Sequence, residues 1–180
     1  MRYRRLGLLL LVLITCGGLN HLTVSQTASA TIPGATLLEQ FVGDVGFGSL
    51  VSFDITQAQE LKNQGVKRSQ IDSVKLQTLA LTITAPANGQ DFTFLDSISF
   101  FVDAAGQPHK EIARAGPFAQ GTRSFNFTLL DVELAPYAAA PSMTFSTAAK
   151  GRKPASDTTL EAKVVLGVDV NVGGLLCGAK

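Results

Sequence analysis

The chain has 180 residues, of which 46% are hydrophobic, so it is long and apolar enough to bury the core of one domain. Its net charge is +1, but Arg2, Arg4 and Arg5 lie at the extreme N-terminus; without them 12 basic residues face 14 acidic ones, which excludes nucleic acid as an expected partner. The only two cysteines, Cys16 and Cys177, exclude a disulfide-rich scaffold and a thiolate zinc cluster.

The first 15 residues have the pattern of an export signal. The segment "MRYRR" is basic, and the ten residues that follow, Leu6–Thr15, are largely apolar. This apolar run is about half of the roughly 20 residues that a membrane-spanning helix needs. Residues 1–15 are therefore predicted to direct export and to be removed.

The end of this segment, Leu13-Ile14-Thr15-Cys16, resembles the lipobox of bacterial lipoprotein precursors. An apolar residue lies three positions before a cysteine, although Thr15 stands where Gly, Ala or Ser is usual. The resemblance implies that the chain is cut before Cys16, that diacylglycerol is attached to Cys16, and that Gly17 after it favours the outer membrane over the inner one.

A second cleavage site competes with the lipobox. Ala28 and Ala30 have the A-x-A spacing of an ordinary signal-peptidase site, which would release a soluble periplasmic or secreted protein beginning at Thr31. In the lipid-anchored alternative, residues 16–31, rich in Gly, Ser, Thr and Ala, are predicted to be a flexible tether. Residues 32–180 are then a single domain.

The first part of that domain combines helical and extended patterns. Thr36–Val42 is compatible with a helical turn, whereas the apolar residues of Val45–Ile55 alternate as in a strand. Thr56 and Gln59 form a capping-box pattern for one short helix that stops at Gly65.

Alternation dominates the remainder. The clearest example is Leu160–Val172, where each even-numbered residue is apolar, so a long strand with one buried face is expected. A change of phase between Val74–Leu76 and Leu79–Ile83 predicts a bulge near Gln77 and Thr78. Further strands are predicted at Phe92–Val102, Lys110–Ala115, Phe125–Leu129 and around Met143 and Phe145, and Pro136 lies in a loop with one turn of helix. The fold class is therefore all-β: a mostly antiparallel β-sandwich, immunoglobulin-like or related, with one short helix.

Residues able to perform catalysis are few. His109 is the only histidine of the predicted domain and lies in a turn, with Asp103 and Glu111 near it in sequence. Asp131 and Glu133 would share one face of a strand, as ordinary solvated acids. No nucleophile and base pair, metal site or cofactor is expected, so the protein is predicted not to be an enzyme.

Two surface features remain. Phe100 and Phe101 cannot both face inward, so Phe101, with Leu95 and Leu130 likewise out of phase, is the candidate binding surface. The cations in "KGRKPAS", Lys150, Arg152 and Lys153, are expected at a turn, where they would be solvated or would touch an anionic headgroup or an acidic partner.

These observations lead to one functional hypothesis and one alternative. The chain is predicted to be an exported envelope protein, held to the membrane through a lipid, with a non-catalytic binding or structural role and an envelope protein as its possible partner. The alternative is a carrier that holds a lipid or another apolar ligand between its sheets.

Overall fold

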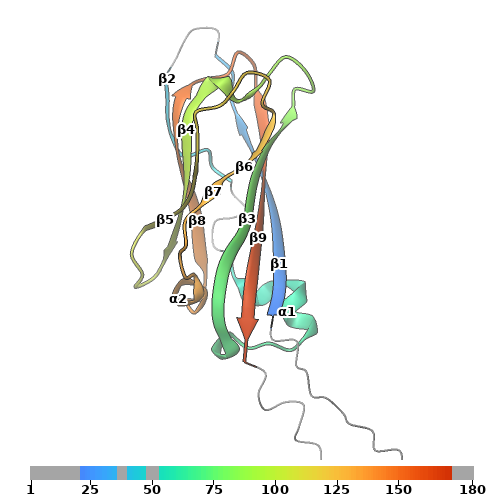
Figure 1. The fold of residues 1–180 in the computed structure, drawn as a ribbon, viewed down its shortest axis with the longest axis vertical. Helices are drawn as coiled ribbons and strands as arrows, with labels where there is room; N and C mark the ends of the chain where they lie inside the picture. The colour runs from blue at the N-terminus through green and yellow to red at the C-terminus, as the bar shows by residue number, and fades with distance from the viewer. Residues whose placement is uncertain (1–20, 36–39, 48–52, 172–180) are drawn as a thin grey trace, which may run out of the picture.

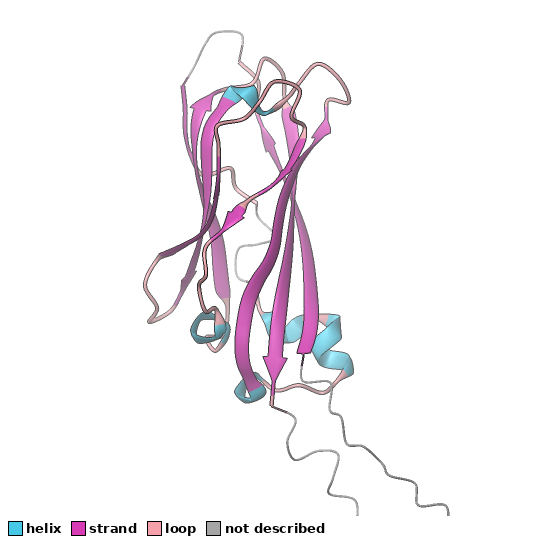
Figure 2. Cartoon of the chain, in the orientation of Figure 1, coloured by secondary structure: helices cyan, strands magenta, loops and turns pink. Residues whose placement is uncertain are grey.

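The computed structural model describes residues 21–35, 40–47 and 53–171, which form an elongated sandwich of two antiparallel sheets (Figures 1 and 2). One sheet has the order β1-β9-β3-β6 and the other the order β2-β8-β4-β5-β7. The fold class predicted from the sequence, an all-β sandwich, is confirmed. The predicted export signal, Cys16 and Cys177 lie outside the described residues.

The strands are β1 (His21–Ile32), β2 (Gln40–Gly43), β3 (Ile71–Ala85), β4 (Leu95–Ala104), β5 (Lys110–Ala115), β6 (Ser124–Asn126), β7 (Thr128–Leu129), β8 (Met143–Arg152) and β9 (Thr158–Val170). The helices are short: α1 (Gln59–Asn63), α2 (Ala135–Ala138) and the 3-10 turns η2 (Ile55–Gln57), η3 (Arg68–Gln70) and η4 (Phe92–Phe94). Within the described residues, no helix is long and apolar enough to span a bilayer.

The period-two pattern near the C-terminus forms β9, as predicted. Its even-numbered side chains from Leu160 to Val170 point into the core, and its backbone pairs with β1 on one side and β3 on the other. The predicted bulge is also present, because the register between β3 and β9 shifts between Leu76 and Thr78. One face of β9 packs on the core and most of the other is open to solvent, which explains the alternation of this segment.

The prediction that residues 16–31 form a flexible tether is wrong for residues 21–31. These residues form β1, which pairs with β9 in an unbroken register from His21 to Ile32. Val24, Ala28 and Ala30 are buried, while the Thr and Ser residues between them face solvent. Several of the inward side chains are small, so the composition of this strand resembles that of a flexible linker. The domain therefore extends further toward the N-terminus than predicted.

The predictions for residues 36–59 are also corrected in part. Gln40–Gly43 is a strand and not a helical turn, and residues 44–47 are irregular although Val45 and Phe47 are buried. Residues 36–39 and 48–52 lie outside the described residues. The helix exists, but Thr56 does not cap it: Thr56 belongs to η2, which Asp54 caps, and α1 begins after Ala58. Gly65, with φ +64°, follows the helix end as expected.

The core is filled by large side chains from both sheets. Phe92, Phe100, Ile98, Leu79, Leu81 and Ile112 are each less than 2% exposed. Phe100 packs edge-on against Phe127 and stacks against Phe47. An apolar ligand between the sheets would have to displace these side chains.

Candidate functional site

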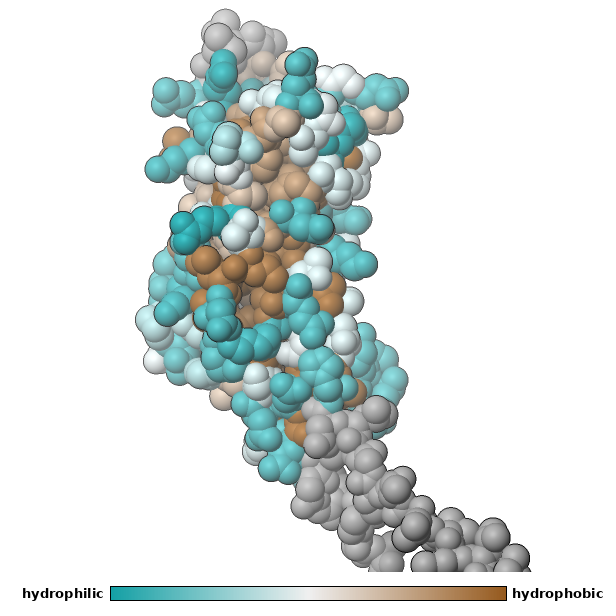
Figure 3. All heavy atoms as spheres, in the orientation of Figure 1, coloured by the Kyte–Doolittle hydropathy of each residue, from teal (hydrophilic) through white to brown (hydrophobic). Residues whose placement is uncertain are grey.

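The sandwich is hollowed where the chain crosses from one sheet to the other. β6 pairs with β3 only over Ala80–Thr82, and β7 then pairs with β5 in the opposite sheet. Beside this crossing lies a groove of about 330 Å³, lined by Lys75, Leu76, Leu129, Leu130, Asp131 and Val132. Figure 3 shows hydrophobic surface gathered over the middle of this face, with a hollow in it. We refer to this feature as the β3–β7 groove.

The edge of β3 contributes backbone groups as well as side chains. The Val74 amide donates to the Glu133 carboxylate, and the Val74 carbonyl accepts from the Leu134 amide. β6 pairs with this edge of β3 only over Ala80–Thr82. The groove therefore lies beside a stretch of β3 that β6 does not cover.

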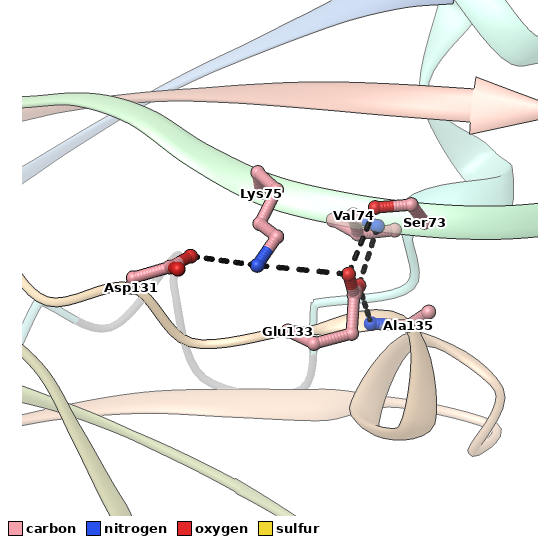
Figure 4. Close-up of polar contacts among 6 residues, drawn as sticks. All are labelled: Ser73, Val74, Lys75, Asp131, Glu133 and Ala135. Carbon is pink, nitrogen blue, oxygen red and sulfur yellow. Dashed lines mark hydrogen bonds and ion pairs between the residues drawn. The ribbon is translucent and has the colours of Figure 1, made fainter.

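A polar network lies beside the groove and shares Lys75 and Asp131 with its lining (Figure 4). Lys75 Nζ lies 2.7 Å from Asp131 Oδ1 and 3.8 Å from Glu133 Oε2. Glu133 Oε1 accepts hydrogen bonds from the amides of Val74 (2.8 Å) and Ala135 (2.9 Å), and Oε2 accepts one from the Ser73 hydroxyl (2.8 Å). Glu133 thus ties the segment before α2 to β3.

These contacts set the ionisation of the network. Partial burial by itself would raise the pKa of Glu133, but the hydrogen bonds from Val74, Ala135 and Ser73, with the charge of Lys75, hold it below its ordinary value. The hydrogen bond with Lys75 lowers the pKa of Asp131, and the same bond raises the pKa of Lys75. All three groups are therefore charged and paired at neutral pH. A carboxylate with a lowered pKa is a weak general base, so the geometry suits binding better than proton transfer.

The sequence located these acids but not their partners. Asp131 and Glu133 lie in the irregular segment between β7 and α2, not on a strand, yet both side chains reach Lys75. Lys75 and Ser73 are 56 and 60 residues away from their partners along the chain. The alternation of β3 contains no signal that would have singled out these two residues.

The predicted binding surface of Phe101, Leu95 and Leu130 is not assembled. Leu95 is only 2% exposed, because an irregularity between Leu95 and Ser97 turns it into the core. Phe101 faces outward, opposite to Phe100 as expected, but its ring stacks on the ring of His109 with centroids 4.5 Å apart. Leu130 lines the β3–β7 groove, and β5 lies between β4 and β7 in the sheet. Leu130 alone remains part of the candidate site.

The two histidines of the described chain each bind a carboxylate on the surface. His109 Nδ1 lies 2.8 Å from Asp103 Oδ1 on the β4–β5 hairpin, and His21 Nδ1 lies 2.7 Å from Asp169 Oδ1. His21 Nε2 also lies 3.2 Å from the side-chain amide of Gln77. Within residues 21–35, 40–47 and 53–171, neither histidine bonds to a hydroxyl or thiol nucleophile, and no group of three His, Cys, Asp or Glu could hold a metal ion.

Comparisons with known proteins give little more than a resemblance in shape. No protein-family model matches the sequence, and no curated protein matches it. Among solved structures, the chain is similar to a decameric BFDV capsid protein, with 11% identity and a TM-score of 0.47, over 84% of this chain and 98% of that one. It is also similar to a 60-mer BFDV capsid protein, with 12% identity and a TM-score of 0.45, over 83% and 93%.

Proposed function

We propose that the protein is an exported, lipid-anchored domain of a bacterial cell envelope, attached through Cys16, with a non-catalytic binding or structural role. Because Gly17 follows Cys16, we propose the outer membrane and not the inner one as the site of the lipid. An envelope protein is the proposed partner, and the β3–β7 groove is the proposed contact.

The position of β1 supports the anchor over cleavage after Ala30. Cleavage there would remove the ten residues from His21 to Ala30, all of which pair with β9 and which include the buried Val24 and Ala28. It would leave β9 as an unprotected edge. Cleavage before Cys16 retains the whole strand. Four residues then lie between Cys16 and His21, so the five residue steps from one to the other span at most about 18 Å.

The β3–β7 groove supports the non-catalytic role. Its lining combines Leu76, Leu129, Leu130 and Val132 with a lysine already paired to two carboxylates. Such a site favours an uncharged apolar side chain over an anionic substrate. The same apolar lining also supports the alternative function, a carrier of a lipid or another apolar ligand. That ligand would bind in the groove and not between the sheets.

Intact and native mass spectrometry of the protein made in an exporting bacterial host tests the proposal. We expect an N-terminal Cys16 that carries diacylglycerol, recovery with the membrane fraction, and loss of both in Cys16→Ser. A soluble product beginning at Thr31, or an unmodified chain beginning at Met1, would overturn the anchor. A co-purified apolar small molecule that is lost in Leu130→Asp would favour the carrier over a protein partner.

A further inference from the structure

One end of the molecule carries an exposed aliphatic side chain between two cations. In the pairing of β2 with β8, Val42 lies opposite Lys150 and Gln40 lies opposite Arg152. Directly opposed residues of an antiparallel pair share one face of the sheet. All four residues are exposed, whereas Phe41 packs against the core. We refer to Val42, Lys150 and Arg152 as the tip patch.

Val42 is apolar although most of its side chain lies in solvent. Its exposed fraction is 72%, and it is the only large apolar residue in the described part of the chain that lies mostly in solvent. It belongs to a short edge strand, where a polar or charged side chain would protect the sheet from pairing with other chains.

The two cations beside Val42, Lys150 and Arg152, are exposed. Within the described residues, neither Lys150 nor Arg152 forms an ion pair or a side-chain hydrogen bond. Asp96, on the neighbouring strand β4, is exposed but pairs with neither of them. The patch therefore combines two exposed positive charges with an accessible aliphatic group.

The tip patch lies at the opposite end of the molecule from the start of β1. β8 ends beside β2 at the top of Figure 1, whereas β1 starts beside α1 at the bottom. The 12 residues of β1 run along most of this length, about 40 Å. A lipid on Cys16, five residue steps before His21, would therefore be held closer to the start of β1 than to the patch.

We propose that the tip patch binds the surface of a bilayer rich in anionic lipid. Lys150 and Arg152 would pair with headgroup phosphates, and Val42 would enter the boundary between headgroups and acyl chains. An acidic polymer would satisfy the cations but would leave Val42 in water, whereas a lipid surface offers both anionic phosphates and an apolar layer for all three residues. This contact goes beyond the anchor at Cys16 and does not depend on it.

Vesicle tethering by the full, lipid-bearing protein tests this inference. The protein is reconstituted into phosphatidylcholine vesicles and mixed with acceptor vesicles of equimolar phosphatidylglycerol and phosphatidylcholine. We expect tethering of these acceptors, none of pure phosphatidylcholine acceptors, and a loss of about thirtyfold in apparent affinity in K150S/R152S. V42S should also weaken tethering, while K62S/K67S, which removes two exposed lysines near α1, should not.

Equal tethering of both acceptors, or full activity of K150S/R152S, would overturn the inference. It is also overturned if soluble polyglutamate binds the protein and V42S has no effect on vesicles, because the partner would then be an acidic polymer. If the protein does not float with the donor vesicles, the anchor fails instead. The same protein added directly to the anionic vesicles then still tests the tip patch.

Discussion

At the scale of single residues, Glu133 carries the most concentrated set of contacts in the candidate site. Its two oxygens accept from two backbone amides and one hydroxyl, and Lys75 lies beside it. Each of these donors would have to find water if the carboxylate were removed, and the amides of Val74 and Ala135 lie at a seam between β3 and α2. Glu133 is therefore a positioning residue that holds one wall of the groove.

Replacing Glu133 by alanine should lower the free energy of unfolding by about 1–2 kcal/mol, since the hydrogen bonds are partly exposed to solvent. Gln should cost less, because an amide oxygen can still accept from both backbone amides. Urea denaturation monitored by circular dichroism measures the change. Glu60→Ala, on the exposed surface of α1, is the matched control; equal losses in the two alanine variants would contradict the assigned role.

At the scale of elements, the approach of β8 to the start of β4 depends on a glycine. Gly151 lies opposite Leu95 in the sheet, where the register between the two strands is irregular. A Cβ added at Gly151 would lie 2.7 Å from Leu95 Cα and closer still to the carbonyl oxygen of Phe94, both backbone atoms that cannot rotate away. The pairing of these strands fixes where the tip patch lies.

Gly151→Ala should therefore destabilise the fold by about 2 kcal/mol more than the matched substitution Gly106→Ala. Gly106 has φ +77° in the β4–β5 hairpin but open space around its Cα, so alanine there adds only backbone strain. Thermal unfolding of the two variants measures the difference. A smaller loss at Gly151 than at Gly106 would show that the two strands can move apart freely.

At the scale of the whole molecule, surface carboxylates link stability to pH. Burial alone would raise the pKa of Asp54, but hydrogen bonds from Thr56 and Arg68 bring it below 3.8. The Thr93 hydroxyl and the amides of Gly121 and Thr93 lower the pKa of Asp91. With Asp131 and Glu133, four carboxyl groups therefore bind protons less readily in the folded state than in the unfolded chain.

The unfolded chain takes up protons first as the pH falls through the ordinary values, 4.5 for Glu133 and 3.8 for the three Asp residues. The stability that these groups contribute is thus present above pH 4.5 and is lost progressively below it. We expect the free energy of unfolding, measured by urea titration at a series of pH values, to fall in this acid range. Glu133→Gln should flatten the upper part of the fall; an unchanged profile would refute the linkage at Glu133.

The sequence by itself determined the fold class, the long strand β9 and the bulge in β3, because alternation and its phase are local properties that one strand carries in its own residues. It also separated Phe100 from Phe101 for the same reason. The prediction for β1 was wrong, because several of its inward residues are too small to give a clear alternation of apolar and polar side chains.

Only the tertiary structure decided which of these residues meet. Lys75 and Asp131 come together across 56 residues of chain, and Val42 lies opposite Lys150 through the pairing of β2 with β8. Leu95 enters the core through an irregularity between strands that no single strand encodes. Such contacts depend on register and sheet order, which arise from the packing of the whole chain and not from any one segment.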